Sequence, residues 1–269
     1  MKQQSAPYLA PDTCGRDTLA GVSLPPRVMC LIVSSMIAGL ALGALTRWVD
    51  NLPDGWRSLA LIGGPWLGLA FALGALTVLW GGRGRSAALV GAVATVGAVL
   101  GYYGYMIVVQ HQANGSYLAH YLTFWLVPAL LGGALFGLAG AVWRGAQGRT
   151  KALAVGLLSA VCAGEGGWTT LRFLSAHHSV DVVPVMELAL GVALPLVLAP
   201  ARRDRLVAYG TTIGLGLVGV LCLRLLASLL TLLNQPRAFP IHTRSSDTPF
   251  KYKRCWLLTQ SAIIYTEGQ

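Results

Sequence analysis

Seven long apolar runs, separated by short polar segments, dominate the pattern of residues along the chain. They cover about residues 28–48, 59–80, 87–109, 121–143, 151–173, 182–200 and 207–232. A membrane-spanning helix needs about 20 mostly apolar residues, and each run is close to that length. The sequence shows no ten-residue segments of alternating polarity, which are typical of membrane β-barrels. The pattern therefore predicts an all-α, polytopic transmembrane bundle of about seven spans.

The two ends of the chain differ from this apolar region. Residues 1–27 are rich in proline and lack the apolar core of a signal peptide. They are predicted to form a disordered cytoplasmic tail. The transmembrane helical domain is predicted over residues 28–233. Residues 234–269 shift in composition toward Thr, Ser, Lys, Ile and Tyr and are predicted to be a polar, disordered tail.

Composition supports a membrane protein. The 269 residues are 55% hydrophobic and only 11% charged, and their mean hydropathy is +0.61. Soluble domains carry about 25% charged residues, so most of this surface must face lipid. The net charge of +10 is attributed to loops that meet anionic headgroups rather than to nucleic-acid binding. The expected partner is the lipid bilayer, and the expected location is the cell membrane.

Basic residues are distributed unequally between two sets of loops. The loops that follow the first, third and fifth apolar runs, with the adjoining helix ends, form the poorer set and carry at most three basic residues, Arg47, Arg57 and Arg172. The positive-inside rule places the richer set and the N-terminus in the cytoplasm. That richer set, in loops 81–86, 144–151 and 201–206, carries eight: Arg83, Arg85, Arg144, Arg149, Lys151, Arg202, Arg203 and Arg205.

The C-terminal tail conflicts with this topology. Seven spans put residues 233–269 outside, yet the tail contains Arg237, Arg244, Lys251, Lys253 and Arg254. Three interpretations remain open. The tail is outside despite its charge, or the last run does not span, or the tail does not belong to the ancestral protein, as after a frameshift.

A faint repeat suggests how the spans are organised. Pro65 precedes Trp80 by 15 residues, and Pro128 precedes Trp143 by 15 residues. The fold is then either one helix followed by repeated two-helix hairpins, as in some transporters, or the similarity is chance in a Gly/Ala/Leu-rich chain. Glycine pairs four residues apart, at 64/68, 97/101 and 133/137, would allow close helix approach. Ordinary packing is favoured over dimerisation for these pairs.

Polar and aromatic side chains within the apolar runs collect on the outer side. At a rise of about 1.5 Å per residue, Glu165 lies roughly 20 Å from the cytoplasmic end of its run. A carboxylate in hydrocarbon needs a partner, a proton or a water-filled cavity. A one-sided polar layer is typical of an outward-facing pocket for a small solute. The candidate ligand or proton site is Glu165 with Arg224, Tyr102, Tyr103, Trp168, Trp66 and Glu187.

Each candidate also has a structural interpretation. Glu165 and Arg224 could form an ion pair that only stabilises packing. Tyr102 and Tyr103 fit an interfacial aromatic belt, and Glu187 is expected to be solvated near the interface. Two hypotheses follow. The protein binds or transports a small solute, or it is a structural or accessory subunit that packs against another membrane protein.

Motifs for catalysis and metal binding are absent from the sequence. It contains no HExxH, GxSxG or P-loop motif. The five cysteines are scattered and show no metal-ligand spacing. We therefore expect no enzyme activity, no catalytic residue, no metal and no cofactor.

Three segments carry a resemblance to a known family. They are Pro65-Trp66-Leu67-Gly68-Leu69-Ala70-Phe71, Gly101-Tyr102-Tyr103-Gly104-Tyr105 and Gly164-Glu165-Gly166. With them, the order of elements over about residues 36–230 resembles a family of small actinobacterial multi-pass integral membrane proteins of unknown function. The resemblance implies a membrane fold but no activity. It also implies that residues 234–269 lie outside the common core.

Overall fold

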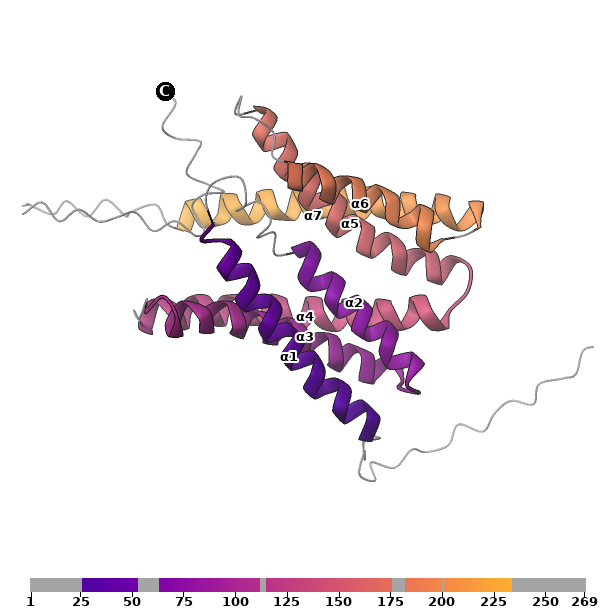
Figure 1. The fold of residues 1–269 in the computed structure, drawn as a ribbon. Helices are drawn as coiled ribbons and strands as arrows, with labels where there is room; N and C mark the ends of the chain where they lie inside the picture. The colour runs from indigo at the N-terminus through magenta and orange to yellow at the C-terminus, as the bar shows by residue number, and fades with distance from the viewer. Residues whose placement is uncertain (1–25, 53–62, 112–114, 176–181, 200, 234–269) are drawn as a thin grey trace, which may run out of the picture.

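The computed structural model describes residues 26–52, 63–111, 115–175, 182–199 and 201–233. Within these ranges the chain forms seven helices and no strand (Figure 1). The predicted all-α bundle is confirmed, since each apolar run contains one helix. Residues 1–25 and 234–269, which hold nearly all of the two predicted tails, lie outside the described residues. The helices are α1 Pro26–Val49, α2 Gly63–Leu79, α3 Gly84–Val108, α4 Gly115–Gly145, α5 Arg149–Ser175, α6 Val182–Leu198 and α7 Arg202–Leu233.

Five of the described helices, α1, α3, α4, α5 and α7, are long and apolar enough to cross a membrane. The other two, α2 and α6, are equally apolar but only 17 residues long. At about 1.5 Å per residue they measure about 25 Å, which is less than the about 30 Å of a bilayer's hydrocarbon core. Both lead into basic turns at their C-terminal ends.

The helices pack in two groups, which Figure 1 shows one above the other. In the first group, α3 packs against α1 and α4, and α2 packs against α3 and α4. In the second, α6 and α7 each pack mainly against α5 and hardly touch each other, although they form one of the predicted hairpins. The groups meet where α5 contacts α4 and α2. An apolar core fills this junction: Ala70, Phe71, Phe136, Ala139, Ala154 and Leu158.

Glycines set the close approach of α1 to α3. A Cβ at Gly43 would collide with the carbonyl oxygen of Ala98, and a Cβ at Gly101 would collide with that of Leu40. Gly133 and Gly137 of α4 lie in the same way against the backbone of α3. The glycine pairs 97/101 and 133/137 therefore serve packing within the chain, as predicted.

A glycine also ends α2 at its basic end. The N–H of Gly82 donates to the carbonyl of Thr77 at 2.8 Å, and the N–H of Gly81 donates to that of Val78 at 3.1 Å. Gly81 has φ 81°, a left-handed conformation that favours glycine. This is the Schellman arrangement, which satisfies the last carbonyls of a helix.

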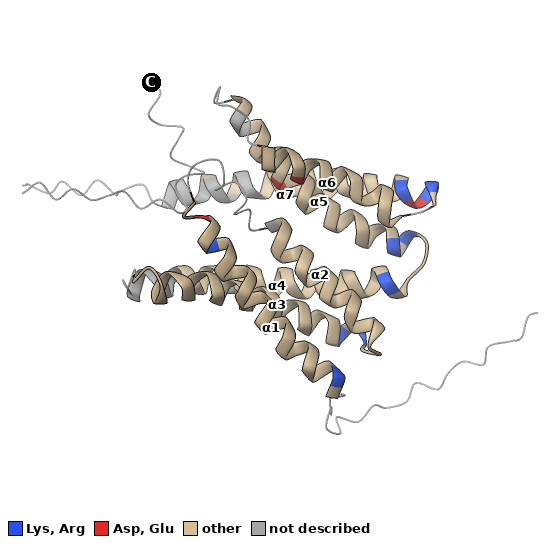
Figure 2. Ribbon diagram, viewed as in Figure 1, with Lys and Arg blue, Asp and Glu red and all other residues tan. Residues whose placement is uncertain are grey.

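Lys and Arg are concentrated at one end of the bundle (Figure 2). The start of α1 and the turns after α2, α4 and α6 lie at this end. Among the basic residues whose side chains are described, only Arg47 lies elsewhere, at the C-terminal end of α1. The bundle therefore has the charge asymmetry on which the topology rests. The cytoplasmic placement of the basic end stays a prediction.

Candidate functional site

Glu165 of α5 contacts the first turn of α2. Its Oε2 accepts a hydrogen bond of 2.8 Å from the backbone N–H of Gly64. The first N–H groups of a helix lack an intrahelical acceptor, and the helix N-terminus carries a partial positive charge. Glu165 therefore caps α2 from another helix, and this contact links the two helix groups.

Glu187 of α6 reaches the same glycine. Because Gly64 has no side chain, Oε1 of Glu187 lies where a Cβ would be. Glu187 is only 8% exposed, and neither of its carboxyl oxygens has a hydrogen-bond partner among the described residues. The expectation that Glu187 is solvated near the interface is wrong, because α2 and α5 cover it.

Two further glycines bring the carboxyl groups together. Gly166 of α5 lies against the α6 backbone around Glu187, and Gly191 of α6 lies against Ala163 of α5. The two helices approach closely there, so Glu187 lies beside Glu165 and interacts with it electrostatically. We call Gly64, Glu165 and Glu187 the acidic site.

The surroundings of Gly64 and Gly68 in α2 differ. Gly68 lies one turn after Gly64 on the same face of α2, and no atom lies within 4 Å of the position its Cβ would take. Near Gly64, the thiol sulfur of Cys162 is 3.8 Å from the corresponding Cβ position. The 64/68 pair thus differs from the other glycine pairs, because no described helix backbone approaches Gly68.

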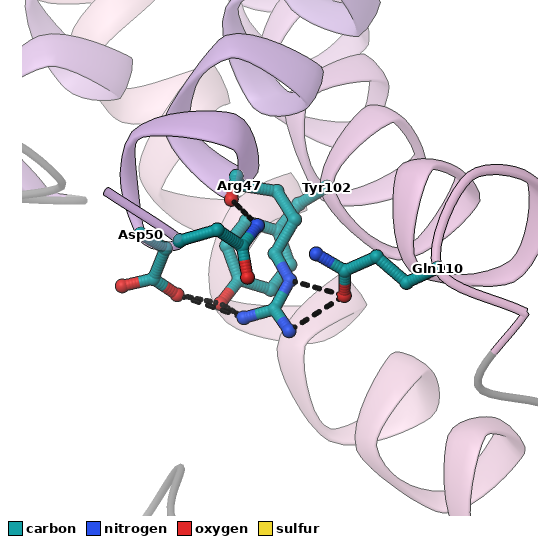
Figure 3. Close-up of polar contacts among 5 residues, drawn as sticks. Arg47, Asp50, Tyr102 and Gln110 are labelled. Atoms are coloured by element: carbon teal, nitrogen blue, oxygen red, sulfur yellow. Dashed lines mark hydrogen bonds and ion pairs between the residues drawn. The ribbon is translucent and has the colours of Figure 1, made fainter. Parts of the chain in front are cut away.

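A second polar cluster lies at the C-terminal ends of α1 and α3 (Figure 3). Arg47, which is 7% exposed, donates from Nη1 to Oδ2 of Asp50 at 2.9 Å and to the hydroxyl of Tyr102 at 3.3 Å. Its Nε and Nη2 donate to Oε1 of Gln110 at 3.2 Å and 2.8 Å. The hydroxyl of Tyr102 donates to the same oxygen of Asp50 at 2.7 Å. We call Arg47, Asp50, Tyr102 and Gln110 the Arg47 cluster.

Trp66, in the first turn of α2, contacts this cluster. Its indole Nε1 donates to Oγ1 of Thr46 at 3.1 Å. Its ring meets the ring of Tyr102 edge to face, with the centroids 6.4 Å apart. One turn of α2 therefore contacts the acidic site through Gly64 and the Arg47 cluster through Trp66.

Comparison with known proteins places the chain in a family. A family model described as a family of unknown function (DUF6518) matches residues 23–229. The chain belongs to this family. The match includes every residue of the acidic site and the Arg47 cluster, and it ends before residues 234–269, as the resemblance implied. No curated protein and no solved structure matches the DUF6518 chain. The actinobacterial origin of the family stays a prediction.

The predicted site residues of the DUF6518 chain do not form a single site in the structure. Glu165 and Glu187 meet at the acidic site. Tyr102 belongs to the Arg47 cluster instead, and the side chains of Trp66 and Tyr103 pack against it. Trp168 lies three residues after Glu165 on α5, and Arg224 lies on α7. The side chain of Arg224 is outside the described part of the chain, so its ion pair with Glu165 stays a prediction.

Sequence reasoning missed three residues of the Arg47 cluster. In the sequence Arg47 is a charge at the end of an apolar run, and Asp50 and Gln110 lie just outside the apolar runs. The spacing of Asp50, three residues after Arg47, is a signal for an ion pair on a helix. No comparable signal identifies Gln110, which reaches Arg47 only because α1 and α3 pack together.

The acidic site suits a proton or a small monovalent cation more than a multivalent metal ion. No group of three or more His, Cys, Asp or Glu in the described residues could hold a metal ion. Two neighbouring carboxyl groups repel each other when both are ionised. In hydrocarbon, such groups are stabilised by a bound proton or a small cation.

Proposed function

We propose that this DUF6518 protein binds a small monovalent cation at the acidic site and exchanges it for a proton across the membrane. The observation that carries the proposal is Glu187, a buried carboxyl that lies beside the Glu165 carboxyl and accepts no hydrogen bond from an N–H group of the described residues. A buried charge without a partner is strongly unfavourable. Without a cation, therefore, the carboxyl carries its proton.

The exchange is balanced in atoms and charge. A cation that approaches Glu187 replaces the proton on the carboxyl oxygen. The products are a carboxylate paired with the cation and one released proton. Glu165 stays hydrogen-bonded to Gly64 and adds negative potential beside the cation. The site thus carries about the same net charge in both states, which limits the desolvation penalty in hydrocarbon.

The position of the site supports a transport role. Substrate sites in many secondary transporters are formed where short or interrupted helices of two halves meet. Here the first turn of the short helix α2 meets the short helix α6 and its neighbour α5. A relative movement of the two helix groups would open this site to either face.

Proton release tests the proposal. The purified full chain, in weakly buffered detergent solution with a pH-sensitive dye, is titrated with chlorides of sodium, potassium, ammonium, methylammonium and guanidinium. We expect one of them to release up to about one proton per chain, and we expect E187Q to abolish the release. The matched control is D204N, which removes a carboxylate at the basic end of α7 and should release protons normally. Release that is absent for every salt, or unchanged in E187Q, would show that the proposal is wrong.

A structural role is the second candidate, and one contact favours it. The bond between Glu165 and the N–H of Gly64 ties α5 to α2 whether or not a ligand binds. Gly210 and Gly214 of α7, moreover, have no atom within 4 Å of their Cβ positions, so this face is free for another membrane protein. Here the chain is an accessory subunit and Arg224 neutralises Glu165. If E165R and R224E each destabilise the protein and the double variant restores stability, the ion pair is structural.

A further inference from the structure

We infer that the Arg47 cluster, acting through Thr46 and Trp66, positions the first turn of α2 and thereby sets the proton affinity of the acidic site. The inference rests on the proposed function, because it assigns a role to residues that contact neither the proton nor the cation. Thr46, Trp66 and the Arg47 cluster would then be positioning residues for Glu187.

The contacts that carry the inference occupy three consecutive residues. Gly64 contacts both carboxyl groups, and Trp66 contacts Thr46 and Tyr102. Pro65 lies between them, and its ring fixes φ and restricts the backbone of Gly64. A displacement of the Trp66 side chain is therefore passed to Gly64 instead of being absorbed by a flexible backbone.

The other side of Trp66 is held firmly. Its partner Thr46 is buried and donates in turn to the carbonyl of Leu42 at 2.8 Å. The ring of Tyr102 is fixed through its hydroxyl, which bonds to Asp50 and Arg47. The guanidinium of Arg47 also lies 5.4 Å from the centre of that ring. Charge-assisted bonds of this kind are stronger than neutral ones, so the surface against which Trp66 packs is rigid.

The sign of the effect follows from the helix dipole. The positive N-terminal end of α2 points at the carboxyl groups and stabilises their anionic forms. If Trp66 loses its anchor, the turn moves more freely and this stabilisation weakens. Glu187 then holds its proton more tightly, and the pH at which it releases the proton rises.

The experiment uses the proton itself as the probe. Infrared spectra of the full chain in detergent are recorded against pH, and the carbonyl band of protonated Glu187 is identified by its loss in E187Q. T46V removes the acceptor of the indole N–H with little change in shape. T46S keeps the hydroxyl. T77V makes the same chemical change near the C-terminal end of α2. Thr77 is also buried, and its hydroxyl donates to the backbone carbonyl of Leu73.

We expect T46V to raise the proton affinity of Glu187 about two- to fivefold, the range that loss of a helix-terminus interaction gives. T46S should keep the wild-type midpoint, and so should T77V, whatever each does to the melting temperature. A T46V midpoint equal to wild type, with only the melting temperature changed, would leave the cluster a structural role and overturn the inference. A wild-type protein without a titrating Glu187 band would overturn the proposed function first.

Discussion

Two glycines of α3 provide a direct test of how α1 packs against it. A Cβ at Gly101 would collide with the backbone carbonyl of Leu40 in α1, whereas a Cβ at Gly104, three residues later, would meet no atom within 4 Å. The same substitution by alanine should therefore have opposite effects on stability at the two positions.

The magnitudes follow from two opposing effects. Alanine is favoured over glycine inside a helix by about 0.5–1 kcal/mol, and both variants gain this amount. Overpacking costs about 1–3 kcal/mol, and only G101A incurs that cost. The cost should lie near the upper limit, because the obstacle is backbone and α1 is also held close at Gly39 and Gly43. G101A should thus lower the free energy of unfolding by about 2–2.5 kcal/mol, and G104A should raise it by up to about 1 kcal/mol.

The assay is reversible unfolding in mixed micelles with an increasing fraction of sodium dodecyl sulfate, followed by circular dichroism. Each variant serves as the control for the other, since both add one methyl group to the same helix. If the two variants shift the transition in the same direction by similar amounts, the α1–α3 contact is not the one described. A wild-type transition for G101A would have the same meaning.

Three further predictions concern the polar residues and the topology. Y102F should lower the free energy of unfolding by about 1.5–3 kcal/mol, because it removes a hydrogen bond to the Asp50 carboxylate; a loss below about 0.5 kcal/mol in the same micelle assay would contradict this. E165Q keeps an acceptor for the N–H of Gly64 and should unfold like wild type, whereas E165L should lose about 1–3 kcal/mol; equal stabilities of E165Q and E165L would show that the bond contributes nothing. In a chain without its native cysteines, a membrane-impermeant maleimide applied to intact cells should label N114C and not Q147C, and the reverse pattern would invert the topology.

The spans could be predicted because hydrocarbon imposes one requirement, a long apolar run. The ends of the helices were less predictable, since backbone hydrogen bonds continue a helix into polar sequence. The apolar run predicted at 121–143 lies within α4, but the helix itself begins earlier, at Gly115, and ends at Gly145. Hydropathy therefore locates the membrane crossing rather than the start of the helix.

The candidate site was less predictable than the fold. Glu165 is visible in the sequence because a carboxylate inside an apolar run is costly on its own. Its neighbour Glu187 depends on how α5 and α6 face each other, which the close contacts at Gly166 and Gly191 determine. Arg47 was misjudged for a related reason: a charge at a helix end is usually solvated, and only the partners on α3 and beyond it explain its burial.

The choice of residues at the junction of the two helix groups suggests that it is not built for stability alone. Around Phe71 and Phe136 the junction is apolar, and such a core needs no partner or proton. At the first turn of α2 the same junction instead contains Glu165 and Glu187, where apolar side chains of similar volume would usually be no less stable. A proton on Glu187 keeps this part of the junction neutral and favours close contact. A carboxylate there favours hydration and separation of the two groups. The proton that the proposed exchange releases would then also control whether the junction is closed or open.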